Sequence, residues 1–153
     1  MAWGEVFVSY SQPDIDVAHE LVSRVEAHGI KCWIAPRDVP GADWVGVTVN
    51  AIATARAMVL VFSASANCSP PVRREVKLAE DRGVRVLPFR IADVAPLKTF
   101  EYCFLRSQPW VDAFPPPLAP HYARLCTFLS TILAAEQPTR MWAWYLPTSR
   151  RQR

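Results

Sequence analysis

Several features that would mark a membrane or secreted protein are missing from this sequence. None of its apolar runs approaches the ~20 residues that a membrane-spanning helix needs. Its start has no basic segment followed by a long apolar stretch, which is the pattern of a secretory signal. We therefore expect a cytoplasmic protein that does not bind a membrane.

The cysteines lack the spacing of a metal or redox site. There are four, and they form no CxxC pair and no metal-ligand pattern with a histidine. We interpret all four as buried thiols in a reducing compartment and expect no metal ion. They are Cys32, Cys68, Cys103 and Cys126.

A strong excess of charge of one sign is missing as well. The formal net charge is +3, and part of it comes from three arginines at the extreme C-terminus. No basic stripe interleaved with aromatic residues lies in the rest of the chain, so direct nucleic-acid binding is not expected.

The composition indicates one compact domain. The 153 residues are 51% hydrophobic and 20% charged, which suits a domain with a core of its own. We assign residues 1–137 to this domain. Residues 138–153 begin with a proline and are too short for a module, so we interpret them as a tail, or as a linker to a sensor domain or partner protein.

Short apolar runs alternate with helical patterns along the chain. This alternation predicts a mostly parallel five-stranded sheet with helices on both faces. The strands are expected over residues 6–8, 30–34, 58–62, 84–89 and, at an edge, 110–111. Helices are expected between Ser11 and Gly29, over 44–55, between Pro70 and Gly83, and over 118–133. Residues 63–69 look like a polar loop, and residues 90–109 show no clear period.

Glu75 occupies an unusual position on its helix. At ~100° per residue, Val72, Val76 and Ala79 form one apolar arc, and Glu75 falls inside that arc. A carboxylate there is costly unless a hydrogen bond, a cation or a ligand compensates it. Glu75 is therefore a candidate functional residue.

Three loops should meet at the carboxyl edge of a parallel sheet, where open α/β folds bind ligands. They are residues 9–11, 35–43 and 63–69. The hydroxyls of Ser9 and Ser11 lie beside the start of the first helix, which suits a phosphate. Ser11 could instead cap that helix and Ser9 could bond the strand end.

Aromatic and basic residues of these segments would complete a nucleotide site. Tyr10 and Trp33 could stack on a flat ring, and Arg37 could pair with an anion. Glu75 would then face the sugar. The structural alternatives stay open: Tyr10 and Trp33 as core aromatics, Arg37 bridged to Asp38, and Glu75 capping a loop or paired with an arginine.

Two enzyme or signalling classes are disfavoured. No G-x-G-x-x-G follows the first strand, which argues against a redox dinucleotide enzyme. A phosphoacceptor domain of this fold class needs an aspartate at the end of its third strand, where this chain has Phe62 and Ser63.

As an ordered set, several segments resemble Toll/interleukin receptor (TIR) domains of the bacterial kind, over about residues 5–133. These segments are Phe7-Val8-Ser9-Tyr10-Ser11, Gly29-Ile30-Lys31-Cys32-Trp33, the Pro-Gly loop, Met58-Val59-Leu60-Val61-Phe62-Ser63, and Arg74-Glu75 with Ala79. The resemblance implies a flavodoxin-like three-layer α/β fold. It also implies, for many members, cleavage of the nicotinamide-ribose bond of NAD, which is a substrate rather than a cofactor.

The resemblance further implies roles for individual residues. Glu75 matches the catalytic glutamate, residues 9–11 match the first box of the family, and Trp33 matches the aromatic residue that ends the second strand. Residues 35–44 match a loop that gates the site and mediates self-association. Similar domains act in antiphage or cell-death defence, and some make cyclic ADP-ribose instead of ADP-ribose.

One departure from the family pattern concerns Pro71. Many active relatives carry a tryptophan four residues before the glutamate, so proline removes a stacking surface and stiffens the approach to Glu75. The alternative to an enzyme is a non-catalytic module that recruits other TIR domains, in which Glu75 is the remnant of an active site.

Overall fold

The computed structural model describes residues 4–39, 44–107 and 110–151, with side chains described as far as residue 135. Its five parallel strands lie in the order β2-β1-β3-β4-β5. They are β1 (Val6–Ser9), β2 (Cys32–Trp33), β3 (Ala57–Phe62), β4 (Arg85–Arg90) and β5 (Val111–Asp112). This order is that of the flavodoxin-like fold, so the predicted fold class is confirmed.

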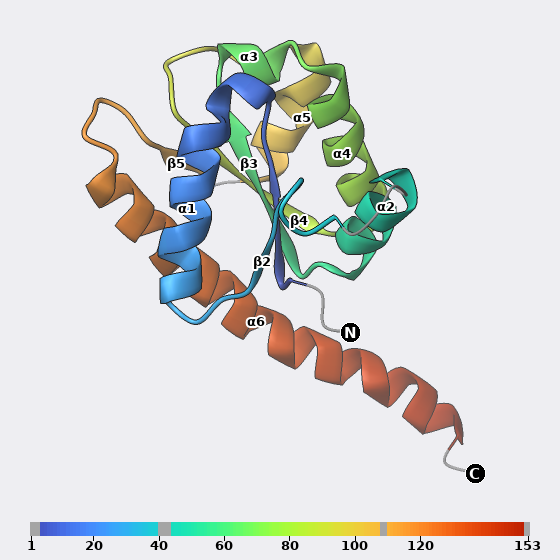
Figure 1. Ribbon diagram of the computed structural model, residues 1–153. Coiled ribbons are helices and arrows are strands. Elements are labelled where there is room, and N and C mark those ends of the chain that lie inside the picture. The colour runs from blue at the N-terminus through green and yellow to red at the C-terminus, as the bar shows by residue number, and fades with distance from the viewer. Residues whose placement is uncertain (1–3, 40–43, 108–109, 152–153) are drawn as a thin grey trace.

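Helices cover both faces of the sheet. The element order places one helix or more between each pair of consecutive strands: η1 (Gln12–Asp14), α1 (Ile15–Ala27), α2 (Trp44–Thr54), α3 (Ala64–Asn67), α4 (Pro70–Asp81), α5 (Lys98–Arg106) and α6 (Ala119–Arg151). Helices α1 and α6 lie against one face, and α2, α4 and α5 lie against the other (Figure 1).

The strands contribute side chains to two separate hydrophobic cores, because successive side chains point to opposite faces of the sheet. In β3 every residue is buried. Val59 and Val61 pack with α1 and α6, whereas Leu60 and Phe62 pack with α2, α4 and α5. A strand buried on both faces must be continuously apolar, as parallel strands are, which is why the sequence reveals β3 so clearly.

Two glycines end helices as the sequence predicts. Gly29 has φ +83° after α1, and Gly83 has φ +74° after α4. These left-handed conformations are strained for residues with a Cβ atom, so glycine is the suitable residue at both turns.

Two helices lie where the sequence predicts no regular structure. Helix α3 occupies part of the expected polar loop, and its N-cap residue Ser63 accepts a hydrogen bond from the Ala66 N–H at 3.0 Å. Helix α5 lies in the stretch without a clear period. Its buried residues Phe100, Cys103 and Phe104 are only three, which is too few to stand out in the sequence.

Other boundaries differ from the sequence prediction. Strand β2 is limited to Cys32 and Trp33, because only these residues pair with Val6 and Phe7 of β1. Helix α6 runs on to Arg151, whereas its apolar pattern ends at Leu133. Within the described part of the chain, no helix has the length and apolar character needed to cross a membrane.

The expectation that all four cysteines are buried is wrong for one of them. Cys32, Cys103 and Cys126 are buried, but Cys68 is exposed. Cys68 is the C-cap residue of α3, at the end of a short helix that the sequence did not predict. All four thiols are free of disulfide bonds.

Candidate active site

Glu75 lies in the second turn of α4, on the side of the helix that faces the sheet. The helix starts at two prolines, and its N-cap residue Ser69 accepts a hydrogen bond from the Val72 N–H at 3.3 Å. Val72 and Val76 are buried, as their apolar arc predicts. The register of this helix therefore places Glu75 beside the core, where it is half-buried.

The carboxylate of Glu75 meets the end of β1. The Ser9 hydroxyl donates a hydrogen bond of 2.7 Å to Glu75 Oε1, and Ser9 itself is buried. Burial raises the pKa of Glu75 to about 7, while the Ser9 hydrogen bond and the charge of Arg74 act in the opposite direction. Near neutral pH this carboxyl group is therefore present in both its charged and neutral forms.

Tyr10 connects the first two loops of this edge. Its hydroxyl donates a hydrogen bond of 2.6 Å to the carbonyl oxygen of Ala35. Burial raises the pKa of Tyr10, and the negative charge of Glu75 raises it further, which indicates that the two side chains are close enough to interact. Residues 40–43 of the second loop lie outside the described residues.

A third connection holds the first and third loops together. Asp14 Oδ2 accepts hydrogen bonds from the hydroxyls of Ser11, at 2.8 Å, and Ser63, at 2.5 Å. The Ser11 hydroxyl thus bonds the Asp14 carboxylate and does not cap a backbone N–H, because the chain here forms the short η1 turn. The roles of Asp14 and Ser63 as loop connectors were not evident from the sequence.

Trp33 lies away from the cavity surface. Its ring stacks on Phe7 with centroids 4.9 Å apart and an interplanar angle of 12°. Only 3% of Trp33 is exposed, and its buried indole N–H lacks a hydrogen-bond partner among the described residues. The structure therefore gives Trp33 a core position and leaves little of its ring for a ligand.

Arg37 is held by acidic neighbours and does not approach Glu75. Its guanidinium lies 3.0 Å from Glu26 Oε2 and 2.7 Å from Asp38 Oδ2. It also donates to the Cys32 carbonyl at 2.9 Å. The hydrogen bonds to Asp38 and Glu26 raise the pKa of Arg37, so the bridge to Asp38 that the sequence left open is present.

A cavity of about 730 Å³ opens between α2 and α4, and Glu75 is part of its wall. This size is typical of small-molecule sites. Trp44 and Pro71 also line it, and 50% of Trp44 is exposed. Sequence reasoning did not select Trp44, although it follows the second loop directly and begins α2.

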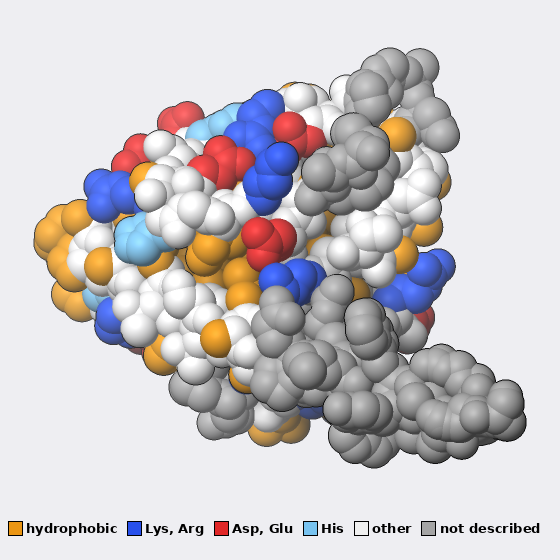
Figure 2. All heavy atoms as spheres, turned by 90° about the horizontal axis from the view of Figure 1, so that it is seen from below, with side chains coloured by type: hydrophobic (Ala, Val, Ile, Leu, Met, Phe, Trp, Pro, Cys, Tyr) orange, Lys and Arg blue, Asp and Glu red, His pale blue; other side chains and the backbone are white. Residues whose placement is uncertain are grey.

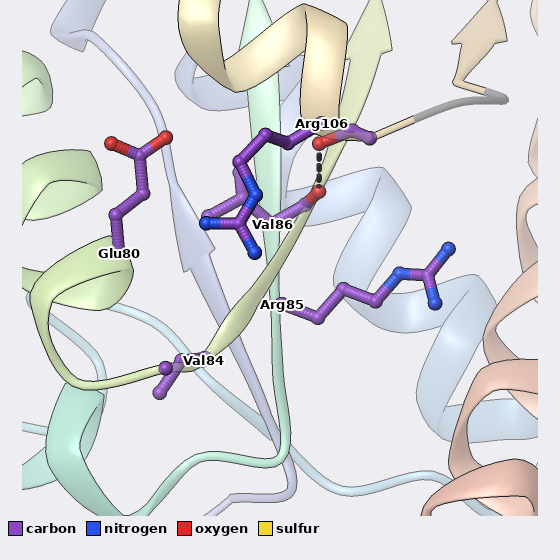
Figure 3. Close-up of a pocket in the computed structure, with 7 residues that line it drawn as sticks. Glu80, Val84, Arg85, Val86 and Arg106 are labelled. Atoms are coloured by element: carbon purple, nitrogen blue, oxygen red, sulfur yellow. Dashed lines mark hydrogen bonds between the residues drawn. The ribbon is translucent and has the colours of Figure 1, made fainter.

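A second, smaller cavity of about 230 Å³ lies at the start of β4, between α4 and α5. Figure 3 shows Glu80 and Arg106 on its two sides, with Arg85 pointing away from them. The Ser107 hydroxyl is bonded to the Val86 carbonyl oxygen at 2.5 Å, so it is already engaged in the fold. No hydrogen bond or ion pair joins Glu80 to Arg106 across this cavity.

Surface charge on the lower side of the molecule is mixed. Seen from below, acidic, basic and hydrophobic side chains are interspersed on the described part of this face (Figure 2). Across the described residues, no group of three or more His, Cys, Asp or Glu side chains is arranged to hold a metal ion.

Comparison with known proteins gives consistent results. A family described as "TIR domain" matches residues 6–119 of this chain. The TIR domain of the Toll-related receptor TRR-2 from the lower metazoan Hydra magnipapillata is 19% identical, with a TM-score of 0.67 over 84% of this chain and 98% of that one. No sequence among curated proteins matches the chain.

Two further solved structures are similar. A metazoan TIR-STING receptor from C. gigas is 27% identical, with a TM-score of 0.53 over 77% of this chain and 36% of that one. The TIR domains of an activated resistosome that directly recognises a pathogen effector are 22% identical, with a TM-score of 0.54 over 67% of this chain and 69% of that one.

Proposed function

This chain belongs to the TIR domain family, and we propose that it cleaves the nicotinamide-ribose bond of NAD, with Glu75 as the catalytic residue. One observation carries the proposal. A half-buried carboxyl group with a pKa raised to about 7 receives a hydrogen bond from Ser9 and lines a cavity of ligand size. Ionisable groups perturbed in this way are concentrated at functional sites.

The reaction needs few catalytic groups. The bond between the ribose C1′ and the nicotinamide nitrogen breaks, and its electron pair leaves with nicotinamide, which becomes neutral. The positive charge that develops on the ribose is stabilised by the ionised Glu75 carboxylate, as in glycoside hydrolysis. Water then attacks C1′ and yields ADP-ribose and a proton, or the adenine attacks instead and yields a cyclic ADP-ribose.

The other predicted site residues divide into two groups in this proposal. Both Ser9 and Tyr10 lie near Glu75: the buried Ser9 hydroxyl holds the carboxylate in place, and the partly exposed Tyr10 contacts the bound substrate. Ser11, Trp33 and Arg37 support the surrounding loops through their bonds and packing. This arrangement leaves the phosphates to be held by other basic residues.

The proposed setting is prokaryotic defence or cell death in the cytoplasm, as for bacterial members of the family. Activity would require several copies to associate, and a sensor domain or partner protein would bring them together. Exposed apolar residues at the start of α2 and on or beside α5 are consistent with such contacts: Val45, Leu97, Tyr102 and Leu105. The same residues favour the second candidate function, a non-catalytic module that binds other TIR domains.

Release of nicotinamide by the purified protein separates the two candidates. We expect release from NAD by the wild-type protein, with a rate that rises with pH around a midpoint of about 7 as Glu75 ionises. Glu75→Gln should lower the rate by about 100-fold or more. Chromatography of the products distinguishes ADP-ribose from its cyclic form.

Self-association must be allowed for in this experiment. The assay is therefore repeated at high protein concentration, with a crowding agent and on a nucleating surface. If wild type and Glu75→Gln are equally inert under all these conditions, the enzyme proposal is wrong and the interaction module is the better interpretation.

A further inference from the structure

We propose that Trp44 is the surface on which a flat ring of the dinucleotide stacks, in place of the aromatic residue that Pro71 excludes. This inference rests on the proposed function, because it takes NAD as the ligand. The shared chemistry is a planar aromatic ring, which belongs either to nicotinamide or to adenine. The experiment below distinguishes the two rings.

Trp44 is well placed to contact a ligand near Glu75. It lines the same cavity as Glu75 and Pro71, and 50% of it is exposed. Among the described residues no hydrogen bond or ring contact engages its indole. Indole offers a large, rigid face for stacking, and that face is strongest for a ring that carries positive charge.

No other described aromatic residue lines this cavity. Trp33 is 3% exposed and stacked on Phe7, so it cannot supply the surface without leaving the core. Pro71, four residues before Glu75, has no aromatic ring. Trp44 is therefore the one candidate for stacking that the described part of the cavity offers.

The wall of this cavity also carries positive charge. Three basic residues of α4 line it together with Glu75. Lys77 pairs with Asp81 at 3.3 Å, whereas Arg73 and Arg74 form no ion pair with another described residue. The charge of Arg74 acts on Glu75, so it lies near that carboxylate.

The exposed indole and the two arginines together favour a dinucleotide over a smaller ligand. Two unpaired guanidinium groups suit the diphosphate of a dinucleotide, and the exposed indole suits one of its rings. A free base would use the indole but not the arginines, and inorganic phosphate would use the arginines but not the indole. A dinucleotide uses both, and it presents its ribose to Glu75.

The experiment measures NAD binding by calorimetry to the full chain carrying Glu75→Gln, which holds substrate without turning it over. In that background Trp44→Ala should weaken binding about tenfold, since one stacked base contributes about this much. Trp44→Tyr keeps an aromatic ring and should stay within about threefold. Tyr102→Ala removes a similarly exposed ring from α5 and should leave the affinity for NAD unchanged.

Two partial ligands identify the ring. If the loss in Trp44→Ala is reproduced with nicotinamide mononucleotide, the ring is nicotinamide. If it is reproduced with ADP-ribose, the ring is adenine. Melting temperatures of all variants check that the exposed positions tolerate the changes.

The proposal is overturned if NAD does not bind the Glu75→Gln protein, or if it binds with the same affinity after Trp44→Ala. It is also overturned if Trp44→Ala changes only the sedimentation of the protein, because a second copy then covers this residue. Failure of the proposed function looks different: NAD binds in a Trp44-dependent way, but the wild-type protein releases no nicotinamide.

Discussion

The Ser9 hydroxyl donates a hydrogen bond to Glu75 across 66 positions of sequence, which joins the end of β1 to the second turn of α4. The bond stabilises the charged form of a carboxyl group that burial pushes toward its neutral form. Ser9 thus increases the fraction of Glu75 that is ionised near neutral pH, and four predictions about this site and its framework can be tested.

Ser9→Ala should move the pH dependence of nicotinamide release. Without the donated hydrogen bond the pKa of Glu75 rises further above about 7, so the midpoint of the pH–rate profile should rise by about 1. Ser11→Ala is the matched control, because its hydroxyl donates to Asp14 instead. An unchanged midpoint in Ser9→Ala would show that Glu75 does not limit the rate.

Glu75→Gln should stabilise the fold at high pH. The pKa of Glu75 rises from 4.5 to about 7 on folding, so between these values the native state binds more protons and the free energy of unfolding falls as pH rises. Removing the charge should raise that free energy at pH 8 by about 1–3 kcal/mol. At pH 4 the two proteins should be similar, which urea unfolding at both pH values checks.

Asp112→Asn should loosen the edge strand β5. Arg90 donates to both carboxylate oxygens of Asp112, at 2.7 and 3.0 Å, and the Trp110 indole donates to the first of them at 2.9 Å. Losing this charge-assisted pair should cost about 1–3 kcal/mol of unfolding free energy. Glu20→Gln, which breaks the exposed pair with Arg24, should cost less than about 0.5 kcal/mol.

Gly4→Ala should be more harmful than Gly29→Ala, although Gly4 does not have a positive φ. A Cβ atom at Gly4 would lie 2.5 Å from the Cys32 carbonyl carbon and the Trp33 backbone nitrogen, which cannot move without disturbing β2. At Gly29 there is open space, and only the strain of φ +83° remains, about 1–2 kcal/mol. Thermal unfolding of both variants tests this comparison. Equal melting temperatures for Gly4→Ala and Gly29→Ala would contradict it.

The sequence predicts most of the framework because its signals are local. Continuous apolar runs reveal β1, β3 and β4, and helical spacing reveals α1 and α4. Helix α5 escapes prediction because it buries only three residues, and α3 because a single turn has no period.

Prediction of the candidate site is more uneven. The inward position of Glu75 follows from helical register alone, and its approach to Ser9 follows from the parallel sheet. The burial of Trp33 and the engagement of Arg37 depend on contacts with Phe7 and Glu26, which lie far away in sequence. Trp44 was missed because its exposure and its place in the cavity wall are properties of the packed helices.

The brevity of the outermost strands limits how copies of this chain can join. Strands β2 and β5 each have two residues, so neither border of the sheet offers a long row of backbone groups to a neighbouring molecule. Higher-order complexes must then be built from side chains of helices and loops. Their formation should respond to single surface substitutions, and growth by strand addition is disfavoured.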